Sequence, residues 1–310
     1  MTNVIEAHDL VKTYGTLNAV DHLDLAVKGG TVFSLLGPNG AGKTTTVEIL
    51  EGLRKATGGS ATILGSSVAT EYEKVRRKVG ILPQDFEPFD RLTPTEAVAY
   101  WADMFGRRIT KGETKALLES VGLSERARVQ AMRLSGGEKR KLGIAMSLAG
   151  SPELLFLDEP TTGLDPKARR DLWGLITGLR KEGRTVFLTT HYLDEAERLA
   201  DDVAIMHHGK VIERGTPQSL VSDHGSSTAI VLVGAGKPGL EEARAAGFDP
   251  ILEGEDVVVP VKGNGRAKDA LRRLVALEAP VTEIYTRRQT LEDIFLKLVG
   301  ARMEEGVLHE

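Results

Sequence analysis

The feature that most constrains this chain is an octapeptide at residues 37–44 that has the pattern G-x-x-x-x-G-K-[ST]. A short segment at residues 32–36 that is typical of a buried strand precedes it, and a segment with helical periodicity begins at Lys43. A glycine-rich turn between a strand and a helix directs several backbone N–H groups toward one point, at the positive end of the helix dipole. The alternative is a plain turn before a helix, but the full context favours a phosphate-binding loop.

The loop contains the groups that a nucleoside triphosphate and its metal ion require. Its backbone would surround the phosphates, the Lys43 ammonium would contact the β- and γ-phosphates, and the Thr44 hydroxyl would bind Mg²⁺. We therefore predict that ATP and Mg²⁺ bind here. The predicted nucleotide-binding residues of this loop are Gly37, Pro38, Asn39, Gly40, Ala41, Gly42, Lys43, Thr44 and Thr45.

Two acidic residues follow a second apolar run. Residues 154–157 are all apolar, which is typical of a buried strand, and Asp158 and Glu159 come directly after them. Ligands of open α/β sheets bind at this end of the strands. We expect Asp158 to hold Mg²⁺ through its water shell and Glu159 to polarise the attacking water. Taken alone, an Asp-Glu pair is more often two exposed acids that cap a strand.

A third motif opens another predicted helix, over about residues 136–149. Residues 134–138 are Leu-Ser-Gly-Gly-Glu, so Ser135 is placed as the N-cap, and Gly136 and Gly137 supply free backbone N–H groups. By itself this pattern is a turn with a cap. Its place between the phosphate-binding loop and the acidic strand favours a second anion-binding site.

In this order, the three motifs resemble those of the nucleotide-binding subunit of an ABC transporter. Residues 37–44 correspond to Walker A, 134–138 to the signature motif, and 154–158 to Walker B with Glu159 after it. The resemblance extends from residue 1 to about residue 222. It implies an α/β P-loop NTPase fold with antiparallel β and helical subdomains, and an enzyme that hydrolyses ATP to drive transport.

The resemblance also implies roles for residues outside these motifs. Tyr14 corresponds to the aromatic residue that stacks on adenine, and Gln84 to the glutamine that contacts Mg²⁺ and the attacking water. His191 corresponds to the histidine that contacts the γ-phosphate, and Asp165 to the aspartate of the D-loop, although it is equally well placed as an N-cap. The implied catalytic residues are Glu159, His191, Gln84 and Lys43, the metal ligands are Thr44, Gln84 and Asp158, and the signature contacts are Ser135, Gly136, Gly137 and Glu138.

The signature motif departs from the commonest family form at its last position, where Glu138 replaces a glutamine. An acid near a triphosphate repels it, which would weaken dimer closure unless Lys139 or Arg140 compensates the charge. Ser135 and the backbone donors are unchanged, which predicts that phosphate binding is retained.

The chain has one Walker A and one signature motif. Members of the family hold two nucleotides between two such subunits, head to tail, which implies a homodimer here. Residues 92–96 and 290–296 resemble the daunorubicin-resistance-like drug-export branch, whose partner is an integral membrane permease of the ABC-2 type. Two alternatives are the ATPase subunit of an importer and a soluble ABC protein that acts in translation or DNA repair.

The loop from Gln84 to Asp90 and the helical insert after it are the expected contacts with the permease. Phe86 and Phe89 lie in this loop. Either they dock on the partner or they anchor the loop to the core, and the sequence favours neither interpretation.

Composition limits the remaining possibilities. The chain has 40 basic and 44 acidic residues and a net charge of −4, which argues against a nucleic-acid partner. It has no cysteine, which excludes disulfides and thiolate metal sites. We find no signal peptide and no apolar run near the roughly 20 residues of a membrane span. We expect a cytoplasmic subunit that is held at the inner face of the cell membrane by its permease.

The pattern of elements divides the chain into an ATPase domain at 1–222 and an accessory domain at 223–310, with a linker at 222–227. Within the first, alternation at Leu23, Leu25 and Val27 predicts a strand. A helical insert covers about 85–133, and one of its helices begins with Thr93 as N-cap, Pro94 and Glu96.

The accessory domain is predicted to be a small α+β unit. Strands at 228–233 and 281–286, helices at 239–246 and 266–277, and a strand pair across 251–262 give the order βαββαβ, the ferredoxin-like arrangement. A last helix, over about 290–299, is expected to pack on this domain. Its apolar face consists of Leu291, Ile294, Phe295 and Leu298.

Overall fold

The computed structural model describes residues 2–224, 228–261, 267–287 and 290–305. The chain divides into two compact units, Met1–Arg214 and Gly215–Glu310. The sequence predicted a division after residue 222, eight residues later than the one in the structure. The difference arises because residues 222–224 are not part of a linker. They end helix α7 (Pro217–His224), which contacts helix α10 (Leu291–Glu305) of the C-terminal unit. The rest of the expected linker, 225–227, lies outside the described residues.

A six-stranded sheet forms the centre of the N-terminal unit, in the order β10-β9-β3-β8-β7-β6. The pairs β9/β3, β3/β8, β8/β7 and β7/β6 are parallel. The order along the chain differs from the order in the sheet, so loops from distant parts of the sequence meet at one edge. The strands are β3 (Val32–Leu36), β6 (Val79–Leu82), β7 (Leu154–Asp158), β8 (Thr185–Thr190), β9 (Asp202–His207) and β10 (Lys210–Gly215).

The two faces of this sheet belong to two hydrophobic clusters. Phe33, Phe156 and Phe187 point to one face, in register across β3, β8 and β7, with ring centroids 5.1 and 5.3 Å apart. They pack with helix α1 (Lys43–Leu50) and the antiparallel strands. The neighbouring residues along these strands, such as Leu155 and Leu188, point to the opposite face and pack under its helices. Both faces are therefore covered, as a parallel sheet requires.

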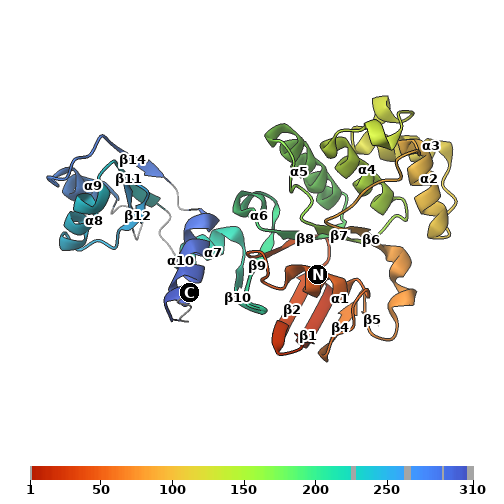
Figure 1. Cartoon of the computed structure of the whole chain (residues 1–310), viewed down its shortest axis with the longest axis horizontal. Coiled ribbons are helices and arrows are strands. Elements are labelled where there is room, and N and C mark those ends of the chain that lie inside the picture. The colour runs from red at the N-terminus through yellow and green to blue at the C-terminus, as the bar shows by residue number, and fades with distance from the viewer. Residues whose placement is uncertain (1, 225–227, 262–266, 288–289, 306–310) are drawn as a thin grey trace. The chain divides into compact units, whose positions relative to one another are not determined.

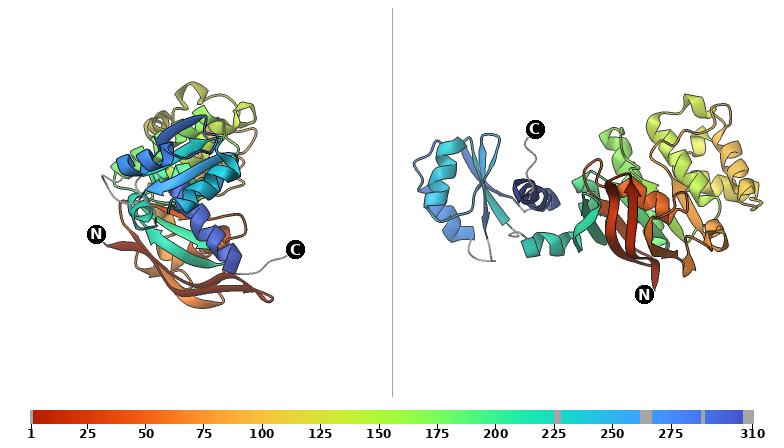
Figure 2. Two further views of the ribbon diagram at one scale, coloured as in Figure 1. Left: turned by 90° about the vertical axis from the view of Figure 1, so that its left-hand side faces the viewer. Right: turned by 60° about the horizontal axis from the view of Figure 1, so that its bottom comes forward.

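Figure 1 shows these layers: α1 and the antiparallel strands lie on one side of the central sheet, and α2 to α6 lie on the other. The antiparallel sheet has four strands in the order β2-β1-β4-β5, and the right-hand view of Figure 2 shows it in red to orange. Its strands are β1 (Asn3–Tyr14), β2 (Leu17–Lys28), β4 (Gly58–Ile63) and β5 (Ser66–Ser67). The alternation at 23–27 correctly placed β2.

Residues 85–133 contain two α-helices, α2 (Pro94–Met104) and α3 (Lys111–Ser120), and no strand, as predicted. The predicted capping box of α2 is present: Thr93 accepts from the backbone of Glu96, whose side chain accepts from the backbone of Thr93. Thr110 and Glu113 repeat the same box at α3. The remaining helices of the unit are α4 (Gly136–Leu148), α5 (Pro166–Lys181) and α6 (Leu193–Leu199), with short 3₁₀ turns at 72–74, 76–78, 124–126 and 131–133.

The C-terminal unit has a four-stranded antiparallel sheet in the order β12-β13-β11-β14. Helices α8 (Gly236–Ala245) and α9 (Ala267–Val275) pack on one face of it, over Ile230, Leu232 and Val257. Figure 2 shows this face in its right-hand view. The strands are β11 (Thr228–Val233), β12 (Ile251–Glu253), β13 (Asp256–Val261) and β14 (Glu283–Arg287).

Helix α10 buries part of its apolar face within the C-terminal unit. Leu291 and Ile294 are almost fully buried, whereas Phe295 and Leu298 are half-buried. Asp293 accepts hydrogen bonds from the Thr290 backbone and hydroxyl, and it pairs with Arg287 on β14 at 2.8 Å. This acid therefore connects the helix start to the sheet. Within the described residues, no helix has the length and apolar character needed to cross a membrane.

The phenylalanine row predicts a large cost for a cavity at its centre. Phe187 is fully buried between the other two rings, so Phe187→Ala should lower the unfolding free energy by roughly 3 to 5 kcal/mol. Leu53 is 71% exposed, and Leu53→Ala should cost less than about 0.5 kcal/mol. Urea unfolding followed by tryptophan fluorescence measures both, because Trp101 and Trp173 lie in the N-terminal unit. Equal costs would contradict this description of the core.

Candidate functional site

The glycine-rich loop between β3 and α1 is packed tightly against neighbouring backbone. Gly42 has a φ of 105°, and a Cβ atom there would lie 2.1 Å from the carbonyl oxygen of Ala19 and 2.7 Å from Cε of Met206. No other residue fits without moving strand β2 or β9. The conformation of the loop is therefore fixed where Gly42 contacts these two strands.

Side chains of the loop divide into those that are buried and those that are open to solvent. Lys43 is buried, and its Nζ donates to the carbonyl oxygens of Gly37 at 2.8 Å and Pro38 at 3.1 Å. Thr44 is exposed at the first turn of α1, and Thr45 is half-buried. The Thr44 hydroxyl is therefore accessible to a ligand of the loop.

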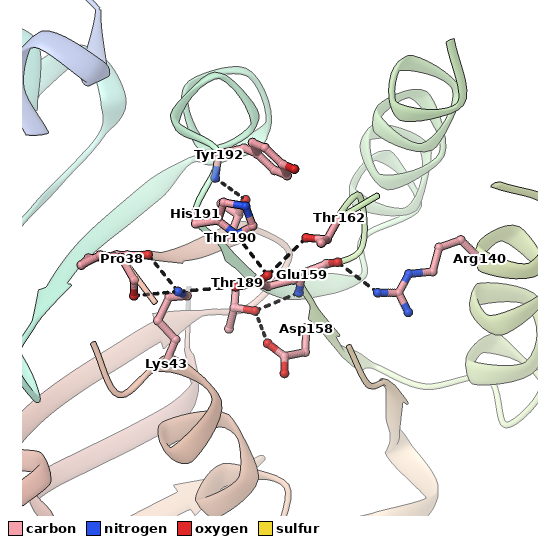
Figure 3. Close-up of polar contacts among 11 residues, drawn as sticks. Pro38, Lys43, Arg140, Asp158, Glu159, Thr162, Thr189, Thr190, His191 and Tyr192 are labelled. Atoms are coloured by element: carbon pink, nitrogen blue, oxygen red, sulfur yellow. Dashed lines mark hydrogen bonds and ion pairs between the residues drawn. The ribbon is translucent and has the colours of Figure 1, made fainter. Parts of the chain in front are cut away.

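Glu159 follows β7 with a left-handed backbone, at a φ of 44°, which is uncommon for a residue with a side chain. Its Oε2 lies 3.0 Å from Nδ1 of His191 and 3.2 Å from the Thr162 hydroxyl, and its Oε1 lies 3.5 Å from Nζ of Lys43. An ionised carboxylate only accepts hydrogen bonds, so Nδ1 of His191 carries a proton. Figure 3 shows these groups converging from three loops at one edge of the sheet.

Charge keeps the Glu159 carboxyl ionised in spite of its burial. Burial raises the pKa of Glu159, but the hydrogen bond from His191 and the charge of Lys43 outweigh it, so the pKa lies below its ordinary value. Burial lowers the pKa of Lys43, and the negative charge of Glu159 opposes that change. The site therefore holds an anion that can accept a proton.

Asp158 and Glu159 are connected through a single hydroxyl. Thr189 Oγ1 accepts from the backbone N–H of Glu159 at 3.0 Å and donates to the carboxylate of Asp158. Burial raises the pKa of Asp158, the hydrogen bond from Thr189 lowers it, and the net shift is upward. Thr189 thus fixes the carboxylate of Asp158 and the backbone of Glu159 from the neighbouring strand β8.

The signature motif forms an exposed helix start. Ser135 is the N-cap of α4 and accepts from the backbone N–H of Glu138 at 3.2 Å, and Glu138 accepts from the backbone N–H of Ser135 at 2.9 Å. The Glu138 carboxylate also accepts from Nε of Arg126 at 2.9 Å. Its pKa lies below its ordinary value: burial raises it, but these hydrogen bonds prevail.

Lys139 and Arg140, the two cations considered as compensation for Glu138, have other partners. Lys139 pairs with Glu87 at 2.7 Å, and Arg140 donates only to backbone carbonyls. The helix carries these two side chains away from the capping box, because neighbours along a helix do not face one another. Arg126, twelve residues earlier, supplies the positive charge instead.

Three predicted residues lie apart from the Lys43–Glu159–His191 group. Tyr14 ends β1 with 41% of its surface exposed, and the cationic ends of Lys12 and Arg54 lie 5.2 and 5.4 Å from its ring centroid. Gln84 is exposed in the turn after β6, and Asp165 accepts from two backbone N–H groups as the N-cap of α5. Each of these three is accessible, but none contacts the buried charges.

The contacts of three polar groups near the buried charges were not predicted from the sequence. Thr162 and Thr189 bind Glu159, and Arg140 donates to the backbone after β6 and β7. Thr189 and Arg140 are distant in sequence from Glu159, and a lone threonine or arginine is not a motif. Only the run Thr189-Thr190-His191 offered a signal, because it ends a strand beside the other motifs.

Comparison with known proteins agrees with this geometry. Residues 20–162 match the family model described as ABC transporter. The chain is 36% identical to the daunorubicin/doxorubicin resistance ATP-binding protein DrrA of Streptomyces peucetius, over 96% of this chain and 93% of that protein. It is 34% identical to the linearmycin resistance ATP-binding protein LnrL of Bacillus subtilis, over 97% of this chain and 100% of that protein. This chain belongs to the ABC transporter ATP-binding subunits.

Other relatives and solved structures support this assignment. A Nod factor export ATP-binding protein I of Cupriavidus pinatubonensis is 36% identical over 98% of this chain and 93% of its own length. The dimeric ATP-binding cassette MJ0796, in a post-hydrolysis state bound to ADP and phosphate, superposes with a TM-score of 0.63 at 26% identity, over 68% of this chain and 98% of that one. The P-loop NTPase fold is confirmed, and the chain is an ATP-binding ATPase subunit.

The buried carboxyl of Glu51, the C-cap of α1, predicts that the stability of the folded protein depends on pH. This carboxyl is 5% exposed, and its Oε1 has no hydrogen-bond partner among the described residues. Burial, with the negative charges of Asp158 and Glu48, raises its pKa from 4.5 to about 8. Between these values the folded protein keeps a proton that the unfolded chain releases. Stability from this group is therefore complete below pH 4.5 and falls as the pH rises toward 8.

An amide at this position does not titrate, so Glu51→Gln should lose less stability than the wild type as the pH rises. The difference in unfolding free energy between the two proteins should grow by roughly 2 kcal/mol from about pH 5.5 to about pH 7.5. Urea unfolding followed by tryptophan fluorescence at each pH measures it. Parallel pH profiles for the two proteins would show that Glu51 is not held protonated.

Proposed function

We propose that this chain is the motor of an exporter. It hydrolyses ATP within a head-to-tail homodimer and so drives a drug-like or other substrate through a separate membrane permease. The observation that carries the proposal is the Glu159 carboxylate, held beside the phosphate-binding loop by Lys43, His191 and Thr162. Near-full-length similarity to proteins named for drug resistance and Nod factor export favours export over import.

Each residue of the site has its own role in the proposed reaction. The loop at 37–45 binds the phosphates, and Lys43 contacts the β- and γ-phosphates. Glu159 accepts a proton from the attacking water, since its carboxylate is ionised and can only accept. His191 orients that carboxylate through Nδ1 and contacts the γ-phosphate, and Tyr14 stacks on the adenine. Gln84 reaches the attacking water from the turn after β6.

Magnesium fits the donor set on this edge of the sheet. Thr44, Gln84 and Asp158 offer a hydroxyl, an amide and a carboxylate, all oxygen donors of the kind that Mg²⁺ prefers. When bound, Mg²⁺ neutralises charge that develops on the phosphates.

Dimerisation completes each site. The helix start at Ser135, Gly136 and Gly137 is accessible and is not in contact with the buried charges of its own chain. In the proposed homodimer it binds the γ-phosphate of the nucleotide held by the partner's loop, with Glu138 and Asp165 nearby. The negative charge of Glu138 is already balanced by Arg126, so it does not oppose closure.

The permease contact is proposed for the surface around Phe89. Phe86 packs against the core of the helical insert and anchors the loop, whereas Phe89 is 47% exposed and stacks edge-on with Tyr100, which is 49% exposed. This pair suits a docking segment of an ABC-2 type permease. Through that partner the chain would lie at the cytoplasmic face of the cell membrane, and no nucleic-acid partner is proposed.

For the C-terminal unit we propose the ferredoxin-like fold. The support is its element order βαββαβ and its antiparallel sheet order, with both helices on one face. Its boundary is proposed to lie between Arg214 and Gly215, with α7 as its first element. As an accessory domain it has no residue in the proposed ATP site.

Glu159→Gln should lower the rate of ATP hydrolysis by roughly 100-fold or more, because an amide does not accept the proton. ATP binding should persist, since the loop at 37–45 is unchanged, and the variant should elute as a dimer in size exclusion with Mg-ATP. Glu153→Gln, an exposed change one residue before the other end of β7, is the matched control and should hydrolyse at the wild-type rate. A Glu159→Gln protein that turns over normally would refute the assigned role.

Phe89→Asp should reduce co-purification of the hydrophobic permease that accompanies the tagged wild-type chain from detergent-solubilised host membranes. A charge at the centre of an apolar contact must lose its water on docking, which we expect to weaken binding by roughly 10-fold or more. Leu53→Asp, at another exposed apolar residue, should leave the yield of permease unchanged. Loss of the permease with both variants, or with neither, would contradict the proposed surface.

A further inference from the structure

The side chain of Arg140 lies buried between the two loops that carry Gln84 and Glu159. It is 7% exposed in the second turn of α4. Its Nη1 donates to the carbonyl oxygen of Pro83 at 2.9 Å, its Nη2 to that of Glu159 at 3.0 Å, and its Nε to that of Pro160 at 3.1 Å. One rigid, planar group thus holds three peptide carbonyls that follow two different strands.

The environment of this cation is unusual for an arginine. Among the described residues no carboxylate forms an ion pair with it, and the charges of Asp158, Asp85, Glu87 and Glu159 act on it only at a distance. Burial lowers the pKa of Arg140, although the guanidinium stays charged. An apolar side chain would avoid this desolvation, so packing alone does not explain an arginine at this place.

Arg140 holds the backbone at Glu159, which has a strained conformation. Glu159 has its left-handed φ of 44°, and its peptide groups are held from two sides. Thr189 on β8 accepts from its N–H, and Arg140 on α4 donates to its C=O. Figure 3 shows Arg140 approaching Glu159 from the side opposite to His191 and Lys43. The direction of the carboxylate toward those two residues therefore depends on the guanidinium.

We propose that Arg140 is a positioning residue for ATP hydrolysis: it fixes the Glu159 backbone and ties it to the Gln84 loop and to the signature helix. This inference rests on the proposed function, since it assumes that Glu159 activates water. Arg140 lies five residues after Ser135 on the same helix. In the proposed dimer it rigidly links the catalytic carboxylate of one site to the helix start that completes the other.

The test compares variants of the full-length chain in steady-state Mg-ATP hydrolysis. Arg140→Gln removes most of the donors and should lower kcat by roughly 10-fold to 100-fold, because Glu159 is misplaced. The affinity for a fluorescent ATP analogue should change less than about twofold, because the loop at 37–45 is untouched. Arg140→Lys should recover part of kcat, since an ammonium can donate to the same carbonyls.

Lys141→Ala is the matched control. Lys141 is the next residue of α4 and pairs with Asp171 at 3.0 Å on the surface of α5, so kcat should stay within about twofold of the wild type. If Arg140→Gln does not fold, Arg140→Met tests the same prediction, because methionine fills the space of the arginine side chain and has no hydrogen-bond donor.

The outcomes separate this inference from the function it rests on. A wild-type chain without ATPase activity overturns the proposed function. An active wild type, an inactive Glu159→Gln and an Arg140→Gln or Arg140→Met protein with normal kcat overturn only the role of Arg140. A parallel loss of ATP affinity, kcat and thermal stability, with no recovery by lysine, also overturns it, because that pattern indicates packing alone.

Discussion

The buried carboxylate of Glu159 is the group on which the rest of the site depends. It lies 3.5 Å from the Lys43 ammonium and 3.0 Å from the His191 ring, and all three belong to loops at one edge of the central sheet. Taking a charge out of water is costly unless partners replace the lost hydration, so the position of each loop is coupled to that of the others. Removing one partner leaves an uncompensated buried charge.

That coupling has a geometric basis in the strand order. Strands β3, β8 and β7 are neighbours, although their sequence positions are 32–36, 185–190 and 154–158. Parallel pairing places their carboxyl ends together, so the phosphate-binding loop, Glu159 and His191 meet without any of them being close in sequence. The phenylalanine row beneath them fixes the register, since a shift by one residue would turn the rings to the wrong face.

Hydrogen bonds from helices add to the positioning that the strand order provides. Arg140 connects α4 to the loops that follow β6 and β7, and Arg126 balances Glu138 at the exposed start of the same helix. Helix α4 therefore has an exposed polar end and a buried cation that holds the loop of Glu159. Such an arrangement lets events at the nucleotide reach a neighbouring surface through a few defined contacts.

The local sequence determined those parts of the protein that depend only on interactions between nearby residues. The phosphate-binding loop, the apolar strand before Asp158, the capping box at Thr93 and the helix start at Ser135 were all predicted, because each depends on residues within one turn or strand. Strands β1 and β4 were not predicted, since register shifts in the pairing of β1 break the alternation that would identify it.

Only the tertiary structure decided which groups meet. Glu138 has Arg126 as its partner and not its neighbours Lys139 or Arg140, because a helix turns adjacent side chains in different directions. Phe86 became an anchor and Phe89 an exposed residue through the packing of one loop, and residues 222–224 of the expected linker belong to helix α7. The sequence thus determined an ATP-binding loop, while long-range packing decided how the Glu159 carboxylate beside it is held.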